Sequence, residues 1–236
     1  MRISLLVEGD TERVFLPTLR AFLSQHLSGK MPNLVVRSYD GRIPKGDKLR
    51  RVVEDLLTKR PTPADAVIAL TDVYTGSSDF TSAADAKAKM RTWVPNNDRF
   101  YPHVAQHDFE AWLLPYWSTI QKLAGHNMAA PSGRPEQVNH QRPPAARIKE
   151  IFERGKCCDS YVKPRDALRI LKDNDLTAAV DACPELKNLS TPSYICQAAQ
   201  PCLDRIRIGL RPPAISPANA TSSVHSPRLH SSNSSR

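Results

Sequence analysis

Acidic residues stand directly after short apolar runs at three places in the sequence. Glu8 follows the run 3–7, and Asp72 follows the run 66–71. A shorter run that ends at Ala105 is followed by three polar candidates, which are His107, Asp108 and Glu110. Carboxylates that meet at one place repel each other unless a proton or a hard cation intervenes. Mg²⁺ or Mn²⁺ with oxygen ligands is the usual solution when phosphate is the substrate, so this pattern favours metal-dependent phosphate chemistry.

The apolar runs predict buried strands that would position these acids. Runs 3–7, 34–36 and 66–71 are almost continuously apolar, which is typical of parallel strands covered on both faces, and run 101–105 is a fourth candidate weakened by Pro102. Helical spacing lies between successive runs, at residues 13–27, 47–60 and 82–94, with Pro17 indicating a start or a kink in the first helix. This order predicts an α/β domain over residues 1–115, with a Rossmann-like, mostly parallel sheet flanked by helices. The carboxyl ends of parallel strands share one edge where ligands bind, so the acids are expected to converge.

The rest of the chain has a different character. Residues 128–146 are rich in proline and polar side chains and predict a linker, and short helical segments follow it. We therefore expect a helical C-terminal region over residues 116–210, with a last helix at 195–210. Residues 211–236 are dominated by Ser, Pro and Asn, which predicts a disordered tail.

Composition narrows the class of protein. The chain has 236 residues, of which 40% are hydrophobic, so it can bury a real core. A net charge of +9 and a pI near 9.5 favour an anionic partner, with nucleic acid the commonest. The start resembles no secretory signal and no apolar run is long enough to span a membrane, so we expect no membrane association and a cytoplasmic location. The five cysteines lack CxxC pairs and are expected to be reduced thiols, with a zinc site that uses some of them as the alternative.

Three motifs carry a family resemblance. VEGDTE, TDVYTGSSDF and HVAQHDFEAWLL, in this order, resemble a family of uncharacterised bacterial Toprim-like proteins, a domain of unknown function related to the Toprim domains of the overcoming-lysogenization-defect (OLD) nucleases. The resemblance covers residue 2 to about residue 190. It implies a Toprim fold and Mg²⁺-dependent phosphodiester chemistry, with Glu8 as general acid or base and Asp72 as a metal ligand. The wider superfamily ends its third strand in Asp-x-Asp, whereas this chain has Tyr74 in place of the second Asp. We expect Glu110, or else Asp108, to supply the missing carboxylate.

Several other residues are accessory candidates. We expect Thr11 to cap the first helix and Glu12 to lie in its first turn, where the helix dipole favours an anion. Tyr74 either packs against the wall of the site or donates a hydrogen bond to phosphate, and His107 is either a loop histidine or a catalytic group. Basic side chains after the second strand are candidates for phosphate contacts, namely Arg42, Lys45, Lys48 and Arg51.

Two functional hypotheses follow. The first is a metal-dependent nuclease, or a subunit of one, whose catalytic and metal-binding residues are Glu8, Asp72 and Glu110. The alternative is a non-catalytic Toprim-like module that binds or senses a partner protein or nucleic acid, and a helical interaction protein is a third reading. The sequence has no GxxxxGK[ST] motif, so ATP hydrolysis would come from a partner ATPase. Such an ATPase, in a phage-defence module, is an expectation from the family resemblance.

Overall fold

A computed structural model describes residues 1–27, 30–73, 79–138, 141–155 and 160–191 of the chain. Several predictions lie wholly or partly outside the described residues, among them the position of Tyr74, the helix at 195–210 and the disordered tail at 211–236. Within the described part, no helix is both long enough and apolar enough to cross a membrane.

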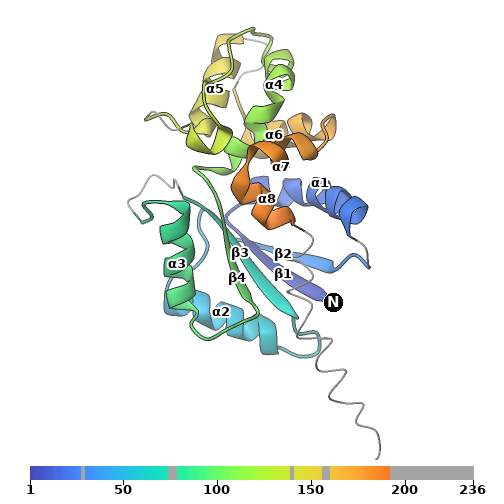
Figure 1. The fold of residues 1–236 in the computed structure, drawn as a ribbon, viewed down its shortest axis with the longest axis vertical. Helices are drawn as coiled ribbons and strands as arrows, with labels where there is room; N and C mark the ends of the chain where they lie inside the picture. Colours follow the sequence, from blue (N-terminus) through green and yellow to red (C-terminus); the bar gives the residue numbers. More distant parts are fainter. Residues whose placement is uncertain (28–29, 74–78, 139–140, 156–159, 192–236) are drawn as a thin grey trace, which may run out of the picture.

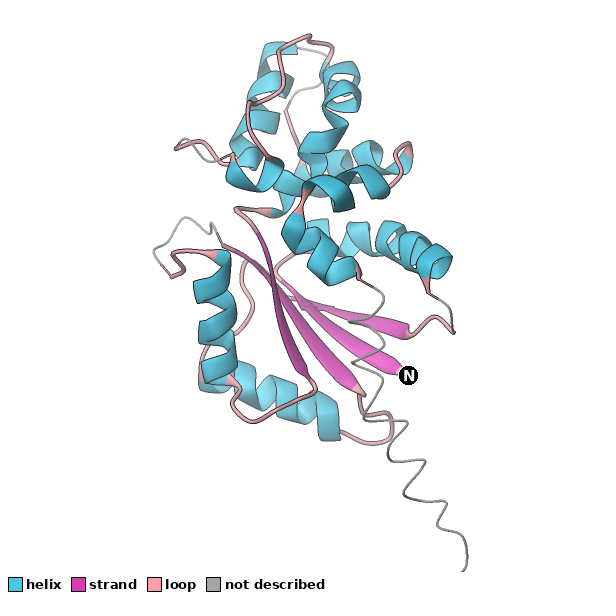
Figure 2. Cartoon of the chain, viewed as in Figure 1, coloured by secondary structure: helices cyan, strands magenta, loops and turns pink. Residues whose placement is uncertain are grey.

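The centre of the fold is a parallel sheet, drawn in magenta in Figure 2. Its four strands lie in the order β2-β1-β3-β4. The strands are β1 (Arg2–Val7), β2 (Asn33–Ser38), β3 (Ala66–Asp72) and β4 (Phe100–Ala105). Every neighbouring pair is parallel, which confirms the predicted α/β class. Pro102 does not interrupt β4, because β4 is an edge strand in which a proline nitrogen need not donate to a neighbour.

Three crossover helices cover the two faces of the sheet. They are α1 (Asp10–His26), α2 (Asp47–Thr58) and α3 (Ala83–Trp93). Strand residues alternate between two hydrophobic clusters, so that Leu6 packs with α2 and α3 while Leu5 packs with α1 on the opposite face. Figure 1 shows α2 and α3 on one side of the sheet and α1 on the other. Helix α1 begins at Asp10 and runs through Pro17, so it starts earlier than the sequence pattern suggested.

Most of the C-terminal helices gather beyond the carboxyl ends of the strands, in the upper part of Figure 1, and the last of them lies lower, near the sheet. They are η1 (Phe109–Tyr116), α4 (Trp117–Ala124), η2 (Pro135–Gln137), α5 (Pro144–Gly155), α6 (Lys163–Lys172), α7 (Thr177–Ala182) and α8 (Pro184–Ser190). Rings of Phe15 on α1 and Phe109 on η1 meet edge to face with 5.4 Å between centroids. One hydrophobic cluster joins these rings to α5, α6 and one face of the sheet. The helical region therefore packs directly over the edge of the sheet that carries the acids.

Candidate functional site

The carboxyl ends of β1 and β3 form the centre of the candidate site. Strands β2 and β3 lie on opposite sides of β1, so the strand order reverses between β1 and β3, and open α/β sheets bind ligands at such a switch point. Glu8 directly follows β1, and Asp72 is the last residue of β3. Thr71 donates a hydrogen bond from its hydroxyl to Oε1 of Glu8. The sheet thus brings together the two acids that the sequence pattern singled out.

Both acids have an unusual affinity for protons. Burial raises the pKa of Glu8 to about 7, although the hydrogen bond from Thr71 acts in the opposite direction. Repulsion by Glu12 adds to this rise, and attraction by Arg42 reduces it. The pKa of Asp72 is raised well above its ordinary value by burial, and then by the negative charge of Glu8 and of three further acids. The ionised forms of both acids are therefore poorly stabilised at the switch point when no cation is bound.

Glu12 belongs to the same cluster and also completes the start of α1. The sequence analysis expected Thr11 to cap this helix, but the residue at the cap position is Gly9. The Gly9 N–H donates to Oε2 of Glu12 at 3.1 Å, which satisfies one of the backbone donors left open at a helix start. The side chain of Glu12 is buried, and burial, with repulsion by Glu110, raises its pKa. Glu12 thus has a structural hydrogen bond in addition to its place among the acids.

The segment after β4 contributes two more buried acids. Asp108 is 3% exposed and Glu110 is fully buried. Oδ2 of Asp108 accepts the N–H of Ala145 at 3.1 Å, whereas its Oδ1 is buried without a hydrogen-bond partner among the described residues. Burial and repulsion by Glu110 raise the pKa of Asp108 to about 7. Asp108 is therefore as strong a candidate for the additional carboxylate as Glu110, which the sequence analysis favoured.

Lys163, at the start of α6, is a site residue that the sequence analysis missed. Its Nζ lies 3.2 Å from each carboxylate oxygen of Glu110. Tyr161 donates a further hydrogen bond from its hydroxyl to Oε1 of Glu110 at 3.3 Å. Burial acts to lower the pKa of Lys163, but the negative charges of Glu110, Asp108 and Asp72 outweigh it and raise the pKa. No local motif marks Lys163, because only the packing of α6 brings it to the acids.

The start of α6 is held by a buried carboxylate. Asp166 is fully buried, and its Oδ2 accepts the N–H of Val162 at 2.8 Å. Arg165 and Arg169 pair with this carboxylate at 2.9 Å and 3.1 Å. These contacts fix the first turn of α6 and, with it, the position of the Lys163 backbone.

Replacement of Lys163 by Met is expected to lower the free energy of unfolding by about 1–2 kcal/mol at pH 7, since it leaves the buried Glu110 carboxylate without a cation. We expect the loss to be moderate, because half of the Lys163 side chain is in solvent and the pair is partly screened. Urea unfolding monitored by circular dichroism measures it. Lys163→Arg keeps the charge and is the control. If Lys163→Met and Lys163→Arg unfold at the same urea concentration, the ion pair does not stabilise the site.

The donor set of the cluster suits a hard cation. Its members are carboxylates that crowd one another, and hard divalent cations prefer oxygen ligands. The unpartnered Oδ1 of Asp108 is a buried oxygen of the kind that a cation would satisfy. Among the described residues, however, no three His, Cys, Asp or Glu side chains are arranged as they stand to hold one metal ion. Lys163 binds Glu110 and Thr71 binds Glu8, so metal binding would require these acids to exchange partners.

The remaining polar candidates have separate outcomes. His107 is half-buried, and burial lowers its pKa, which favours the neutral imidazole. Tyr74 lies outside the described residues, so neither of its two readings is tested. Cys183 is a buried free thiol, and the other four cysteines also lie outside the described residues.

The basic segment after β2 divides into two parts. Arg42 and Lys45 both pair with Asp79, whose Oδ2 lies 2.6 Å from Nη1 of Arg42. Lys48 and Arg51 lie in the first half of α2 with exposed side chains. The four residues therefore do not form one uniform basic surface.

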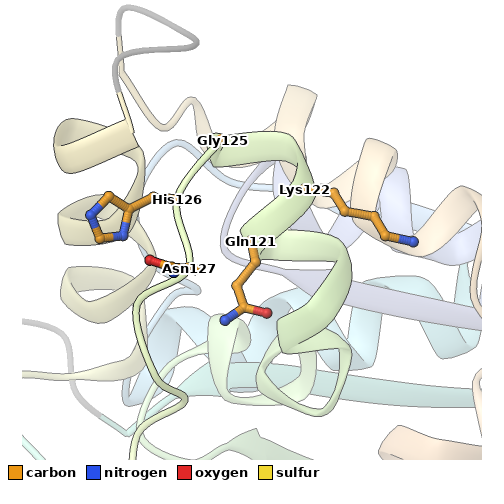
Figure 3. Close-up of a pocket in the computed structure, with 5 residues that line it drawn as sticks. All are labelled: Gln121, Lys122, Gly125, His126 and Asn127. Atoms are coloured by element: carbon orange, nitrogen blue, oxygen red, sulfur yellow. The ribbon is translucent and has the colours of Figure 1, made fainter.

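A pocket of about 410 Å³ lies in the helical region, apart from the acids (Figure 3). Its lining residues are Gln121, Lys122, Gly125, His126 and Asn127. The turn that forms it is held by a hydrogen bond from the Met128 N–H to Nδ1 of His126 at 3.0 Å. None of the predicted site residues lines this pocket.

The fold and the site together make this an α/β protein with a parallel sheet and buried acids at the switch point of that sheet. The chain belongs to the family described as a domain of unknown function, DUF4276, whose model matches residues 7–191. No curated protein matches it. Among solved structures, the C-terminal region of the Burkholderia pseudomallei OLD protein is similar, with 17% identity, a TM-score of 0.43 and coverage of 87% of this chain and 98% of that one. The C-terminal region of the Xanthomonas campestris pv. campestris OLD protein is similar with 14% identity, a TM-score of 0.40 and coverage of 88% and 97%.

Proposed function

We propose that this protein is a metal-dependent nuclease, or a subunit of one, that acts on the phosphodiester bonds of nucleic acid. The observation that carries the proposal is the convergence of Glu8 and Asp72 at the switch point of the sheet, where both have raised pKa values. Three more carboxylates, from α1 and from the segment after β4, lie close enough to repel them. Such a concentration of negative charge is unfavourable without a cation, and structural carboxylates in a fold seldom gather in this way.

The residues of the site have distinct proposed roles. Mg²⁺ or Mn²⁺ would be held by Glu8, Asp72 and either Asp108 or Glu110. When bound, the cation would supply Lewis-acid polarisation of a phosphoryl oxygen. Without a bound cation, burial raises the pKa of Glu8 to about 7. If Glu8 does not hold the cation, this pKa would suit a group that takes or gives a proton at neutral pH. Lys163 would stay charged because of its carboxylate neighbours and would stabilise negative charge that develops on the phosphate.

The polyanionic substrate is proposed from charge. The chain carries a net charge of +9, and four basic residues follow β2, namely Arg42, Lys45, Lys48 and Arg51, of which Arg42 lies close enough to Glu8 to lower its pKa. Contacts of this kind bind the phosphate backbone without regard to sequence and make binding salt-dependent. We place this activity in the cytoplasm, with a partner ATPase in a phage-defence module as the proposed setting.

Two observations favour a second candidate function, a non-catalytic module that binds nucleic acid or a partner protein. Lys163 already neutralises Glu110, and the acids among the described residues do not stand in a metal-holding arrangement. In this reading, Lys163 takes the place of a cation and the cluster has a structural purpose. The two functions differ in whether added Mg²⁺ binds to the folded protein and supports cleavage.

The experiment that tests the proposal is cleavage of labelled single-stranded and double-stranded DNA and RNA by the purified chain in Mg²⁺, Mn²⁺ or EDTA. We expect cleavage in at least one metal and none in EDTA. Calorimetric titration of Mg²⁺ and Mn²⁺ into the metal-free protein accompanies it. Metal binding without cleavage of any substrate would favour a subunit that needs its partner. Neither binding nor cleavage would favour the non-catalytic module.

A further inference from the structure

Two basic side chains converge on a single carboxylate oxygen beside the acidic cluster. Nη1 of Arg42 lies 2.6 Å from Oδ2 of Asp79, and Nζ of Lys45 contacts the same oxygen. The three side chains are 33–37% exposed, so solvent reaches the group that they form. An oxyanion held by one guanidinium and one ammonium at a surface is the arrangement that proteins use for phosphate.

Backbone contacts fix this group next to the site. The segment after β2 is attached to the end of β1, because the Tyr39 N–H donates to the carbonyl of Val7 at 3.0 Å and the Gly41 N–H donates to the carbonyl of Glu8 at 3.2 Å. Arg42 is therefore one residue away from a direct contact with Glu8. The position of Asp79 is held from α3, where Lys89 donates to the Asp79 carbonyl at 2.8 Å.

We propose that Arg42 and Lys45 form a subsite for a backbone phosphate of nucleic acid, and that Asp79 occupies this subsite when nucleic acid is absent. The chemical basis is exchange of one oxyanion for another. Ion pairs with this degree of exposure contribute little stability, so a phosphate can replace the carboxylate at small cost. A backbone phosphate belongs to a polymer whose neighbouring phosphates can contact the protein at the same time, whereas Asp79 offers a single negative charge. Nucleic acid can therefore displace Asp79 from the two cations. The inference rests on the proposed function only in taking nucleic acid as the ligand, and it does not depend on cleavage.

The test is the affinity of Asp79→Asn for a labelled 20-nucleotide single-stranded DNA, measured by fluorescence anisotropy in EDTA over a range of salt concentrations. We expect the variant to bind about 3–10-fold more tightly than the wild type at low salt, because the one negative charge that competes with phosphate for the two cations is removed. We also expect a steeper plot of log Kd against log salt concentration. Its slope should increase by about 0.7 for each additional phosphate of the single strand that the variant neutralises. Circular dichroism establishes that the variant is folded.

Two comparisons make this result specific. Asp55→Asn is the control: it removes one negative charge, as Asp79→Asn does, but from an exposed pair between Asp55 of α2 and Lys59. We expect its affinity to stay within about twofold of the wild type. In a protein that also carries Arg42→Gln and Lys45→Gln, Asp79→Asn is expected to give no gain. Equal gains in Asp79→Asn and Asp55→Asn, an unchanged affinity in Asp79→Asn, or no binding by any variant would each overturn the subsite. If Asp79→Asn binds DNA more tightly while the chain neither binds metal nor cleaves any substrate, the subsite is upheld and the nuclease proposal is contradicted.

Discussion

Replacement of Glu8 by Gln, or of Asp72 by Asn, is expected to lower the rate of metal-dependent cleavage by about 10²–10⁴-fold. Each amide keeps the shape of the acid but removes the anionic oxygen that holds a cation or accepts a proton. The two residues lie on neighbouring strands at the switch point, so the two losses should be similar in size and should not add in the double variant. Initial rates on the best labelled substrate, in Mg²⁺ and in Mn²⁺, measure the effect.

Matched variants locate the remaining ligand. Asp108→Asn and Glu110→Gln separate the two candidates after β4, and the one that holds the cation should also lower Mn²⁺ affinity in calorimetry. Glu153→Gln removes a carboxylate from an exposed pair with Lys149 and is the control, with an expected rate equal to that of the wild type. Full activity in Glu8→Gln and Asp72→Asn would place the chemistry elsewhere in the chain.

Glu8→Gln is expected to be more stable than the wild type at neutral pH in metal-free buffer, by about 3 kcal/mol in free energy of unfolding. The cause is the pKa of Glu8, which lies near 7 in the folded protein against an ordinary value of 4.5. A raised carboxyl pKa means that the folded state holds the proton more tightly than the unfolded state. The contribution of Glu8 to stability is therefore complete below pH 4.5 and is lost as the pH rises to 7. Glutamine does not titrate and avoids this loss.

The measurement is the difference between the two stability curves from pH 4 to pH 8 in EDTA. This difference is needed because burial lowers the pKa of His103 to about 4, so His103 makes the fold more stable as the pH rises from 4 to 6.5 and opposes the trend of Glu8. Both proteins contain His103, so its effect cancels. We expect the curves to run together below pH 4.5 and to separate up to pH 7. A constant separation at every pH would show that the Glu8 pKa is not raised.

Loss of cleavage and a gain in stability in the same variant, Glu8→Gln, would together identify Glu8 as part of a functional site. A residue that is kept for its chemistry at a cost to the fold behaves in this way. A residue kept for packing would lose stability on substitution instead.

Much of the fold was predictable because the signals were local. The continuous apolar runs at β1 and β3 indicated strands covered on both faces, and the 3.6-residue spacing in α2 indicated a helix with one buried side. Strands that alternate with helices build a parallel sheet, and the confirmed α/β class follows from that order. The bounds were less predictable. Helix α1 begins at Asp10, because the Glu12 side chain satisfies the Gly9 N–H, and residue spacing alone did not reveal this contact.

By itself, the sequence determined that acids would follow the strands, since each lies within a few residues of an apolar run. Only the tertiary structure decided what surrounds them. Lys163 reaches Glu110, 53 residues away in sequence, because α6 packs over the strand ends. Asp79 meets Arg42, 37 residues away, because the segments after β2 and β3 reach the same edge of the sheet. Contacts between distant segments depend on how helices pack and not on local spacing, so the acids could be recognised in the sequence while their neutralising partners could not.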